Sequence, residues 1–272
     1  IRIPRDLGAI LVGMSLSVAG AVIQGVTKNE LADPSLIGLN SGASFMLAIT
    51  FAFYPNASFL MLMVAGFLGA MLGGFIVLTI GRSKRNGFNV MKIILAGVAV
   101  SSLLTALSQG IALIFKLNQS LTFWIAGGVS GTTWEQLIWS GPIIIITIVI
   151  LIILSRQLTI LNLGESLAKG LGQNITFIRG ISLFLTMILA GIAVSMVGQI
   201  AFIGLMVPHI VRFSVGTDYT KVLPLTALTG GLFMIVADTV ARMLGEAPVG
   251  AIISFIGVPY FLFLVKRGGH VK

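Results

Sequence analysis

The feature that most constrains this chain is a succession of uncharged, apolar runs that recurs from its beginning to its end. A run of about 20 such residues is long enough to cross a lipid bilayer as an α-helix. Only 9% of the 272 residues are charged, whereas a soluble domain carries about 25%. The sequence therefore predicts an all-α fold, a polytopic bundle of transmembrane helices; a β-barrel would show shorter, alternating segments.

Nine runs are candidate spans, and together they make 1–272 a single transmembrane domain. The spans are Leu7–Val26, Leu36–Tyr54, Ala57–Ile80, Ile93–Phe115, Leu137–Leu154, Ile181–Ile200, Ala201–Val215, Val222–Ala241 and Val249–Val265. The stretch Leu121–Trp134, between the fourth and fifth runs, is too short to cross, and its tryptophans suit the membrane interface.

The loops between the runs set the expected orientation. With the chain start outside, thirteen of the 17 Lys and Arg residues fall in inner loops, and only Arg2, Arg5, Lys116 and Arg242 remain outside. Cytoplasmic loops carry an excess of cations, so the C-terminus is expected in the cytoplasm. Nine spans with an outside start are simplest to explain if one further helix precedes Ile1, which would give ten.

Composition and motifs exclude several function classes. The chain has no cysteine, so disulfides and thiolate metal sites are excluded. Its net charge of +9 is explained by the loop cations, so no nucleic-acid partner is expected. No phosphate-binding GxxxxGK[ST] loop and no HExxH motif occur. His209 has no second His near it in sequence, and metal sites need several ligands. We therefore expect neither an enzyme nor a bound cofactor or metal.

Two polar features lie within or directly beside the apolar runs. Asp238 and Arg242 are four residues apart, so on a helix they can pair. A structural pair is the favoured interpretation, and an ion-coupling carboxylate is the alternative. Asp33 precedes Pro34, and Gly38 follows, which indicates either an interrupted helix start or a short loop with proline in the first helical turn.

The loop 156–179 differs from the other loops because its leucines alternate with charged residues and glycines. This pattern predicts one or two short amphipathic helices on the cytoplasmic face. Such helices can rest on lipid headgroups or dock in a groove of a partner protein. The glycines at the turns favour a compact projection, and hence a soluble partner.

Several ordered motifs resemble one known family over essentially the whole chain. They include RIPR (Arg2–Arg5), Ala19–Ala43, LAGVAVS (Leu95–Ser101), LNLGESLAKGLG (Leu161–Gly172), Gly198–Arg212, ADTVAR (Ala237–Arg242), EAPVG (Glu246–Gly250) and Ile256–Arg267. The chain is similar to the membrane-spanning permease subunit of the bacterial ABC importers for iron–siderophores, haem and cobalamin. One departure is Glu30, where the family commonly has proline.

The resemblance implies ten helices and a multi-pass permease of the bacterial cytoplasmic membrane. It also implies a pair of permease subunits, identical or different, two ATPase subunits that bind ATP and Mg²⁺, and an external binding protein that delivers the substrate. An iron–siderophore complex is the expected cargo, with haem or cobalamin as alternatives. An ion-coupled secondary transporter is a weaker alternative because few carboxylates lie at membrane depth.

The resemblance also assigns roles to individual residues. Arg2, Arg5 and Arg242 would receive acidic residues of the binding protein, whereas snorkelling into lipid headgroups is the alternative. Contact with the ATPase would involve Leu163, Gly164, Glu165, Ala168, Leu171 and Gly172. The translocation path and gate would involve Asn40, Ser41, Asn89, Val90, Met91 and Ser101. The cobalamin relative has small hydroxyl residues in the loop before LAG, where this chain has Asn89, Val90 and Met91, and this departure makes cobalamin the less expected cargo.

Overall fold

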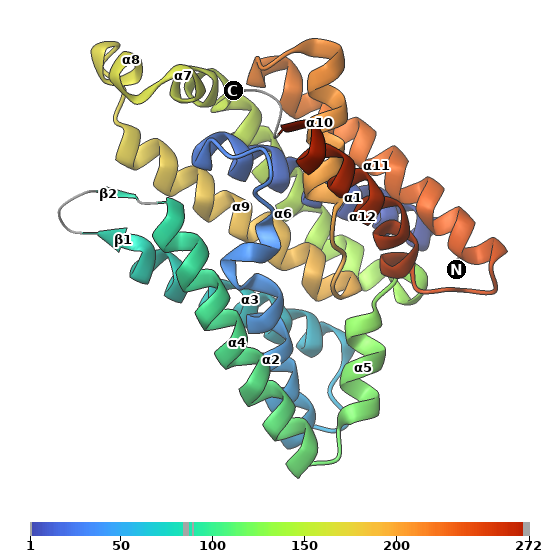
Figure 1. Cartoon of the computed structure of the whole chain (residues 1–272). Helices are drawn as coiled ribbons and strands as arrows, with labels where there is room; N and C mark the ends of the chain where they lie inside the picture. Colours follow the sequence, from blue (N-terminus) through green and yellow to red (C-terminus); the bar gives the residue numbers. More distant parts are fainter. Residues whose placement is uncertain (1, 84–86, 89, 269–272) are drawn as a thin grey trace.

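The computed structural model describes residues 2–83, 87–88 and 90–268, and they form a helical bundle (Figure 1). Its helices are α1 (Arg2–Thr27), α2 (Leu39–Phe53), α3 (Phe59–Gly81), α4 (Val90–Ile114), α5 (Asn118–Ala126), α6 (Trp134–Ile153), α7 (Ser155–Leu163), α8 (Glu165–Gly170), α9 (Ile175–Val197), α10 (Ile203–Val215), α11 (Tyr219–Met243) and α12 (Val249–Gly268). Two 3₁₀ turns, η1 (Pro34–Ile37) and η2 (Val129–Gly131), interrupt the connections. A small antiparallel hairpin pairs β1 (Arg82–Ser83) with β2 (Gly87–Phe88). The helical fold class is confirmed.

Six helices of the described chain are long and apolar enough to cross a membrane: α1, α3, α4, α6, α9 and α11. Three shorter apolar helices accompany them, namely α2, α10 and the stretch Val249–Leu262 of α12. The nine predicted runs thus correspond to six long helices and three short ones. The predicted runs Leu36–Tyr54 and Ala201–Val215 start earlier than their helices, because the chain enters both helices through irregular backbone.

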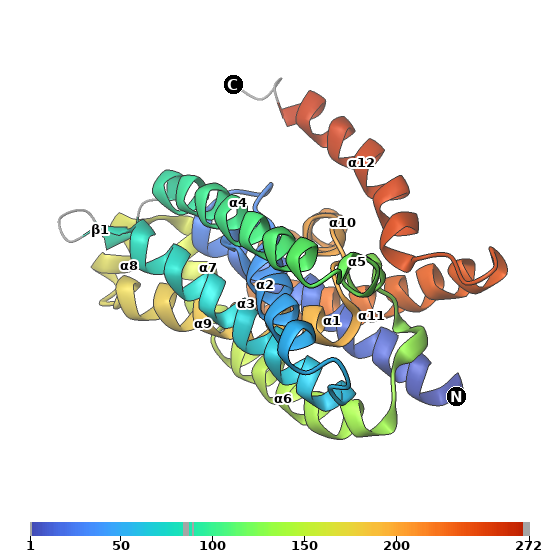
Figure 2. The same ribbon diagram turned by 90° about the horizontal axis from the view of Figure 1, so that it is seen from below.

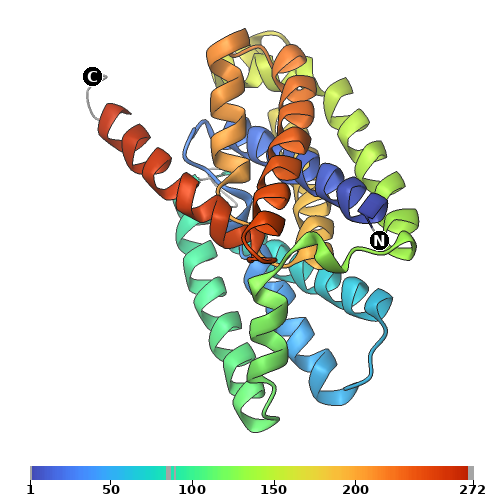
Figure 3. The same ribbon diagram turned by 90° about the vertical axis from the view of Figure 1, so that its right-hand side faces the viewer.

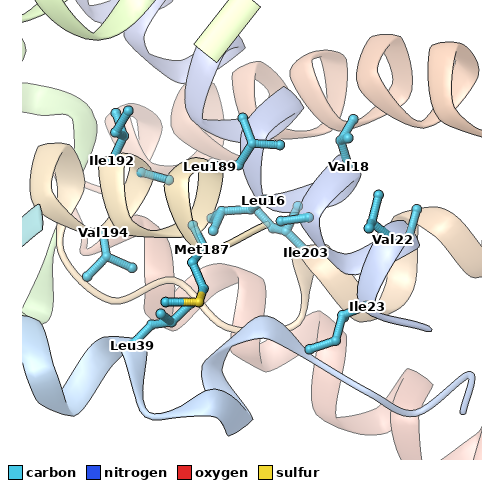
Figure 4. Packing of buried hydrophobic residues seen from close by; sticks show 14 of the residues in the cluster. Leu16, Val18, Val22, Ile23, Leu39, Met187, Leu189, Ile192, Val194 and Ile203 are labelled. Atoms are coloured by element: carbon cyan, nitrogen blue, oxygen red, sulfur yellow. The ribbon is translucent and has the colours of Figure 1, made fainter. Parts of the chain in front are cut away.

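Helix α1 occupies the centre of the bundle and packs against α9, α10 and α11. Most of its apolar window, 83%, is buried inside the chain itself. Figure 4 shows Leu16 and Val22 of α1 among Leu189 of α9 and Ile203 of α10. The apolar character of α1 therefore serves contacts between helices more than contacts with lipid.

Glycines allow the closest contacts between helices, because a residue without a side chain lets two backbones approach each other. A Cβ atom placed on Gly20 of α1 would lie 1.8 Å from the carbonyl oxygen of Gly204 in α10. A Cβ atom on Gly42 of α2 would lie 2.1 Å from the carbonyl oxygen of Gly69 in α3. Any larger residue at these positions would force the paired helices apart.

The predicted interruption at Asp33–Pro34 is confirmed. The Asp33 carboxylate accepts a hydrogen bond of 2.8 Å from the Ser35 amide and so caps η1, whose first residue is Pro34. Gly38 then adopts a left-handed conformation, φ +77°, before α2 begins. Irregular backbone of this kind is tolerated within a membrane protein where the surrounding protein buries it.

The helices define two ends of the molecule. The Arg5 end gathers the start of α1, the end of α9, the end of α11 and the start of α12; the α7–α8 end lies opposite (Figure 1). The directions of the helices place Arg2, Arg5, Lys116 and Arg242 at the Arg5 end. The other described cations lie toward the α7–α8 end: Lys28, Arg82, Lys92, Arg156, Lys169, Arg179, Arg212, Lys221, Lys266 and Arg267. This is the segregation that the loop analysis predicted.

Helix α12 stands apart from the rest of the bundle. It projects away from the other helices in two perpendicular views (Figures 2 and 3). Its apolar side chains Phe255, Ile256 and Leu262 are exposed. The turn before α12 contains Gly245 and Glu246, both with positive φ, +76° and +64°.

Candidate functional site

Five ionisable side chains meet at the Arg5 end, and we call this set the charge cluster. Its members are Arg5 and Asp6 on α1, Asp238 and Arg242 on α11, and Glu246 in the turn before α12. The two helices run antiparallel, so the first turns of α1 lie beside the last turns of α11.

Asp238 is the centre of the charge cluster and is completely buried. Its carboxylate accepts hydrogen bonds from Nε and Nη2 of Arg5 at 3.0 and 2.8 Å. It also accepts hydrogen bonds from Nε and Nη2 of Arg242 at 2.8 and 2.6 Å. Asp238 and Arg242 are thus paired in the structure, and Arg5 is a second partner that the sequence did not reveal. Because Asp238 binds the guanidinium groups of both Arg5 and Arg242, it links α1 to α11.

The other two carboxylates of the charge cluster are exposed. The Glu246 side chain is 58% exposed and accepts a hydrogen bond of 3.0 Å from Nη1 of Arg5, with its second oxygen 2.8 Å from Nη2. The Asp6 side chain is 45% exposed and accepts a hydrogen bond from Nη2 of Arg242. The Arg5 guanidinium lowers the pKa of Glu246 below its usual range, so Glu246 is ionised at neutral pH.

The three arginines predicted to dock a binding protein differ in their surroundings. Arg2 is exposed, the Arg242 side chain is partly exposed, and Arg5 is buried. Arg5 and Arg242 are already paired inside the subunit. The charge cluster contains two cations and three carboxylates, so as folded it presents no excess of positive charge. Docking through these arginines stays a prediction.

A cavity of about 400 Å³ opens beside Arg5 and Glu246. Its walls come from 124 and 126–131, from Met196 and Val197 at the end of α9, and from 247–249, where the chain enters α12. Gly127 fits there because its backbone, at φ +65°, passes close to the Val197 carbonyl oxygen. The cavity leaves space beside Arg5 and Glu246 for a side chain from another protein.

At the opposite end, the loop 156–179 forms the short helices α7 and α8, as predicted. Gly164 and Gly172 flank α8 with φ values of +151° and +74°, which residues with a side chain rarely adopt. Arg179 of α9 donates a 2.6 Å hydrogen bond to Glu165 of α8. This pair lowers the pKa of the Glu165 carboxyl, and it ties α8 to the bundle.

Three leucines spaced four residues apart are exposed at the end of α7, within α8 and directly after α8, and we call this set the leucine patch. The exposed fractions of Leu163, Leu167 and Leu171 are 66%, 48% and 63%. Leu167 was not among the predicted contact residues, although it belongs to the series of leucines that alternates with charged residues in this loop. Ala168 is fully buried, so its side chain belongs to the interior of the subunit and not to the surface predicted to meet the ATPase.

Three of the predicted path residues, Asn40, Ser41 and Ser101, lie near Gly38, whereas Met91 lies apart from them at the start of α4. Ser41 is buried in α2, where its hydroxyl donates to the Gly38 carbonyl at 3.1 Å. Asn40 is half-buried, and Ser101 of α4 is half-buried close to Gly38. Met91 is exposed at the start of α4. Asn89 and the side chain of Val90 lie outside the described residues.

Helix α4 carries an exposed polar row that the sequence analysis missed. Ser102, Thr105 and Gln109 are exposed, and their spacing of three and four residues places them along one face. The neighbouring Leu95, Val98 and Leu113 are exposed as well. The sequence already contained the signal for this row, because hydroxyl and amide residues recur there with the period of an α-helix.

Comparisons with known proteins agree with this arrangement. The model of the FecCD transport family matches residues 1–267. The chain is 43% identical to the iron(3+)-hydroxamate import system permease protein FhuB of Bacillus subtilis, covering 98% of this chain and 70% of that protein. It is 39% identical to the Fe(3+) dicitrate transport system permease protein FecC of Escherichia coli, covering 99% and 82%.

A solved structure shares the fold as well as the sequence. It is an inward-facing metal-chelate type ABC transporter, with a TM-score of 0.90 and 31% identity over 98% of this chain and 86% of that one. The family match spans the charge cluster, the leucine patch and the central helix α1 alike. The chain therefore belongs to the FecCD transport family.

Proposed function

We propose that the chain is the membrane-spanning permease subunit of an ATP-driven importer that carries a ferric siderophore complex across the bacterial cytoplasmic membrane. The observation that carries this proposal is the family match over 1–267, since relatives named for iron(3+)-hydroxamate and Fe(3+) dicitrate import match nearly the whole chain. A TM-score of 0.90 to a metal-chelate type transporter supports the same assignment.

The proposed topology has nine spans in the described chain, with the Arg5 end outside and the α7–α8 end in the cytoplasm. The segregation of cations toward the α7–α8 end supports this orientation. The short helices α2 and α10 would complete their crossings with the irregular segments that precede them. The C-terminus would then be cytoplasmic.

The leucine patch is the proposed contact for an ATPase subunit. It is an apolar surface on a polar projection, held in place by the Glu165–Arg179 pair. Leu163, Leu167 and Leu171 would enter a groove of the ATPase, where ATP and Mg²⁺ would bind. This chain would supply no catalytic residue of its own.

The Arg5 end is the proposed landing site of an external binding protein. Arg2 is the arginine best placed for direct contact because it is exposed. Replacing Arg5 by Glu would set a new carboxylate against Asp238 and Glu246 and would disturb the fold. Arg2→Glu is therefore the cleaner test of docking, and it is expected to reduce uptake without preventing membrane insertion.

The cargo would pass along a surface completed by a second permease subunit, which is either a copy of this chain or a related one. The polar row Ser102, Thr105 and Gln109 on α4 is the candidate lining of that surface. Hydroxyl and amide groups without fixed charge favour weak contact and release.

An uptake assay tests the proposal. The permease is expressed together with the ATPase and the binding protein of its import system in a host without iron-chelate importers. Ferric hydroxamate labelled with radioactive iron is expected to accumulate, and an ATPase variant that cannot hydrolyse ATP is expected to abolish uptake. Accumulation that survives this variant but collapses with the ion gradient would instead establish a secondary transporter.

Haem or cobalamin is the second candidate cargo. The chain is 36% identical to the hemin transport system permease protein HmuU of Yersinia pestis and 36% identical to the cobalamin import system permease protein BtuC of Halobacterium salinarum. The same assay with hemin and with cobalamin separates the candidates, because each cargo is offered to an identical assembly.

A further inference from the structure

We propose that Glu246 and Asp6 act as internal competitors at the docking surface: they occupy the guanidinium edges of Arg5 and Arg242 until carboxylates of the binding protein replace them. This inference rests on the proposed function, because it concerns the same landing site. It adds a regulatory role for two carboxylates within the subunit.

The first observation is the division of the Arg5 guanidinium between two partners. Asp238 takes the edge formed by Nε and Nη2, at 3.0 and 2.8 Å. Glu246 takes the edge formed by Nη1 and Nη2, at 3.0 and 2.8 Å. Each edge can hold one carboxylate in a two-point contact, so an incoming carboxylate must displace one of them.

The second observation is the unequal burial of the carboxylates. Asp238 is completely buried and serves both arginines, so it is a permanent partner. The Glu246 and Asp6 side chains are 58% and 45% exposed. Exposed ion pairs contribute little free energy because water and salt screen them. The exposed carboxylates are therefore the ones that can leave.

The third observation is the net charge of the charge cluster. With three carboxylates and two guanidinium groups, the folded cluster carries one excess negative charge. This excess charge does not attract an acidic surface of a binding protein. Removal of Glu246 from Arg5 changes this balance and exposes the Nη1–Nη2 edge, which suits a carboxylate.

The surroundings of Glu246 allow it to move. Glu246 holds a positive φ of +64°, which is uncommon for a residue with a side chain. It lies in the turn between α11 and α12 and borders the cavity of about 400 Å³ beside Arg5. A carboxylate of the binding protein can therefore enter this cavity, and the displaced Glu246 side chain can turn into solvent.

The test measures the affinity of the assembled importer for the binding protein of its import system. The permease is purified with its ATPase subunits in lipid nanodiscs, and binding is recorded at several salt concentrations. Glu246→Gln keeps an acceptor for Arg5 but removes the charge. It is expected to tighten binding about two- to fivefold at low salt, the strength of one exposed ion pair, and Asp6→Asn is expected to act in the same direction.

Glu135→Gln is the matched control, because Glu135 is an exposed carboxylate at the same end, in the first turn of α6, outside the charge cluster. It removes one negative charge without freeing an arginine, and it is expected to leave the affinity unchanged. If Glu246→Gln weakens binding, or matches Glu135→Gln, the competitor role is overturned. Absence of binding by the wild-type assembly would instead overturn the proposed docking itself.

A chemical measurement separates a competitor from a structural partner. Phenylglyoxal modifies accessible arginines, and mass spectrometry locates the product. Arg5 is expected to react faster in Glu246→Gln than in the wild type, and bound binding protein is expected to protect it. Equal rates in the two proteins would show that Glu246 does not shield Arg5, and would contradict the proposal.

Discussion

Arg5 donates hydrogen bonds to both oxygens of the Asp238 carboxylate, at 2.8–3.1 Å, although 233 positions separate the two residues in the sequence. The pair joins the first turns of α1 to the last turns of α11. Asp238 also holds Arg242, so one buried carboxylate fixes two guanidinium groups.

Asp238→Asn is expected to destabilise the subunit by about 3–5 kcal/mol, because it leaves two guanidinium groups without their shared charge partner. Thermal unfolding in detergent and the yield of membrane-inserted protein measure this effect. Asp6→Asn is the control: it removes an exposed carboxylate of the same charge cluster and is expected to cost no more than about 1 kcal/mol. Equal stability of the two variants would contradict the central position of Asp238.

Gly20→Ala is expected to prevent normal packing of α1 against α10. The added Cβ atom would lie 1.8 Å from the Gly204 carbonyl oxygen, and overpacking of this kind costs about 1–3 kcal/mol or more. Gly180→Ala is the control, since nothing lies within 4 Å of a Cβ atom there. Yield and thermal stability of the purified variants would be compared, and a Gly20→Ala protein as stable as Gly180→Ala would disprove the close contact.

Leu167→Glu is expected to weaken association with the ATPase subunit about tenfold or more, because a charge would replace the centre of the leucine patch. The subunit should still fold, since Leu167 is 48% exposed. Copurification of the ATPase and ATP-dependent uptake measure the effect. Thr217→Glu, at an exposed position in the α10–α11 loop at the same end, is the control. An ATPase that copurifies equally with both variants would rule out the leucine patch as the contact.

Gly172→Val is expected to uncouple ATP hydrolysis from uptake. Gly172 has φ +74° and open space around it, so the cost of a side chain arises in the backbone alone, about 1–2 kcal/mol. Asn tolerates this conformation better than other residues, so Gly172→Asn should retain most activity. Hydrolysis and uptake would be measured in the same vesicles. Normal uptake by the valine variant would remove Gly172 from the proposed coupling surface.

The pair Glu165–Arg179 predicts a specific pH dependence. Arg179 lowers the pKa of Glu165 in the folded protein, so the pair stabilises the fold above the unfolded pKa of about 4.3 and loses this effect as pH falls through the lower, folded pKa. The difference in stability between the wild type and Glu165→Gln should be constant from about pH 5 to 8 and should shrink below about pH 4. A difference that changes between pH 6 and 8 would implicate another group.

The sequence predicted the helices better than it predicted their first turns. Uncharged runs located the long helices, because apolar length is a local property. The same counting placed the start of one span at Ile181, whereas α9 begins at Ile175, where the Asn174 side chain caps the helix. Likewise Asp218 caps α11 at Tyr219, ahead of the predicted Val222. Polar caps were visible in the sequence, but a search for apolar residues passes over them.

The charge cluster could be predicted only in part. Asp238 and Arg242 are four residues apart on one helix, so the sequence indicated their contact. Arg5 and Glu246 reach the same place through tertiary packing, which no local pattern encodes. The sequence therefore presented Arg5 as an outward cation, whereas the fold buries it between two carboxylates.

The enclosure of α1 has a consequence for how the protein is made. Translation produces α1 well before α9, α10 and α11, which later surround it. During that interval its small and polar residues face lipid or the insertion machinery. Ser17 can satisfy its hydroxyl within α1 itself, on the Gly13 carbonyl, whereas Gln24 finds its acceptor and its donor on α10. The side-chain amide of Gln24 therefore lacks these hydrogen-bond partners until α10, in the last third of the chain, has entered the membrane.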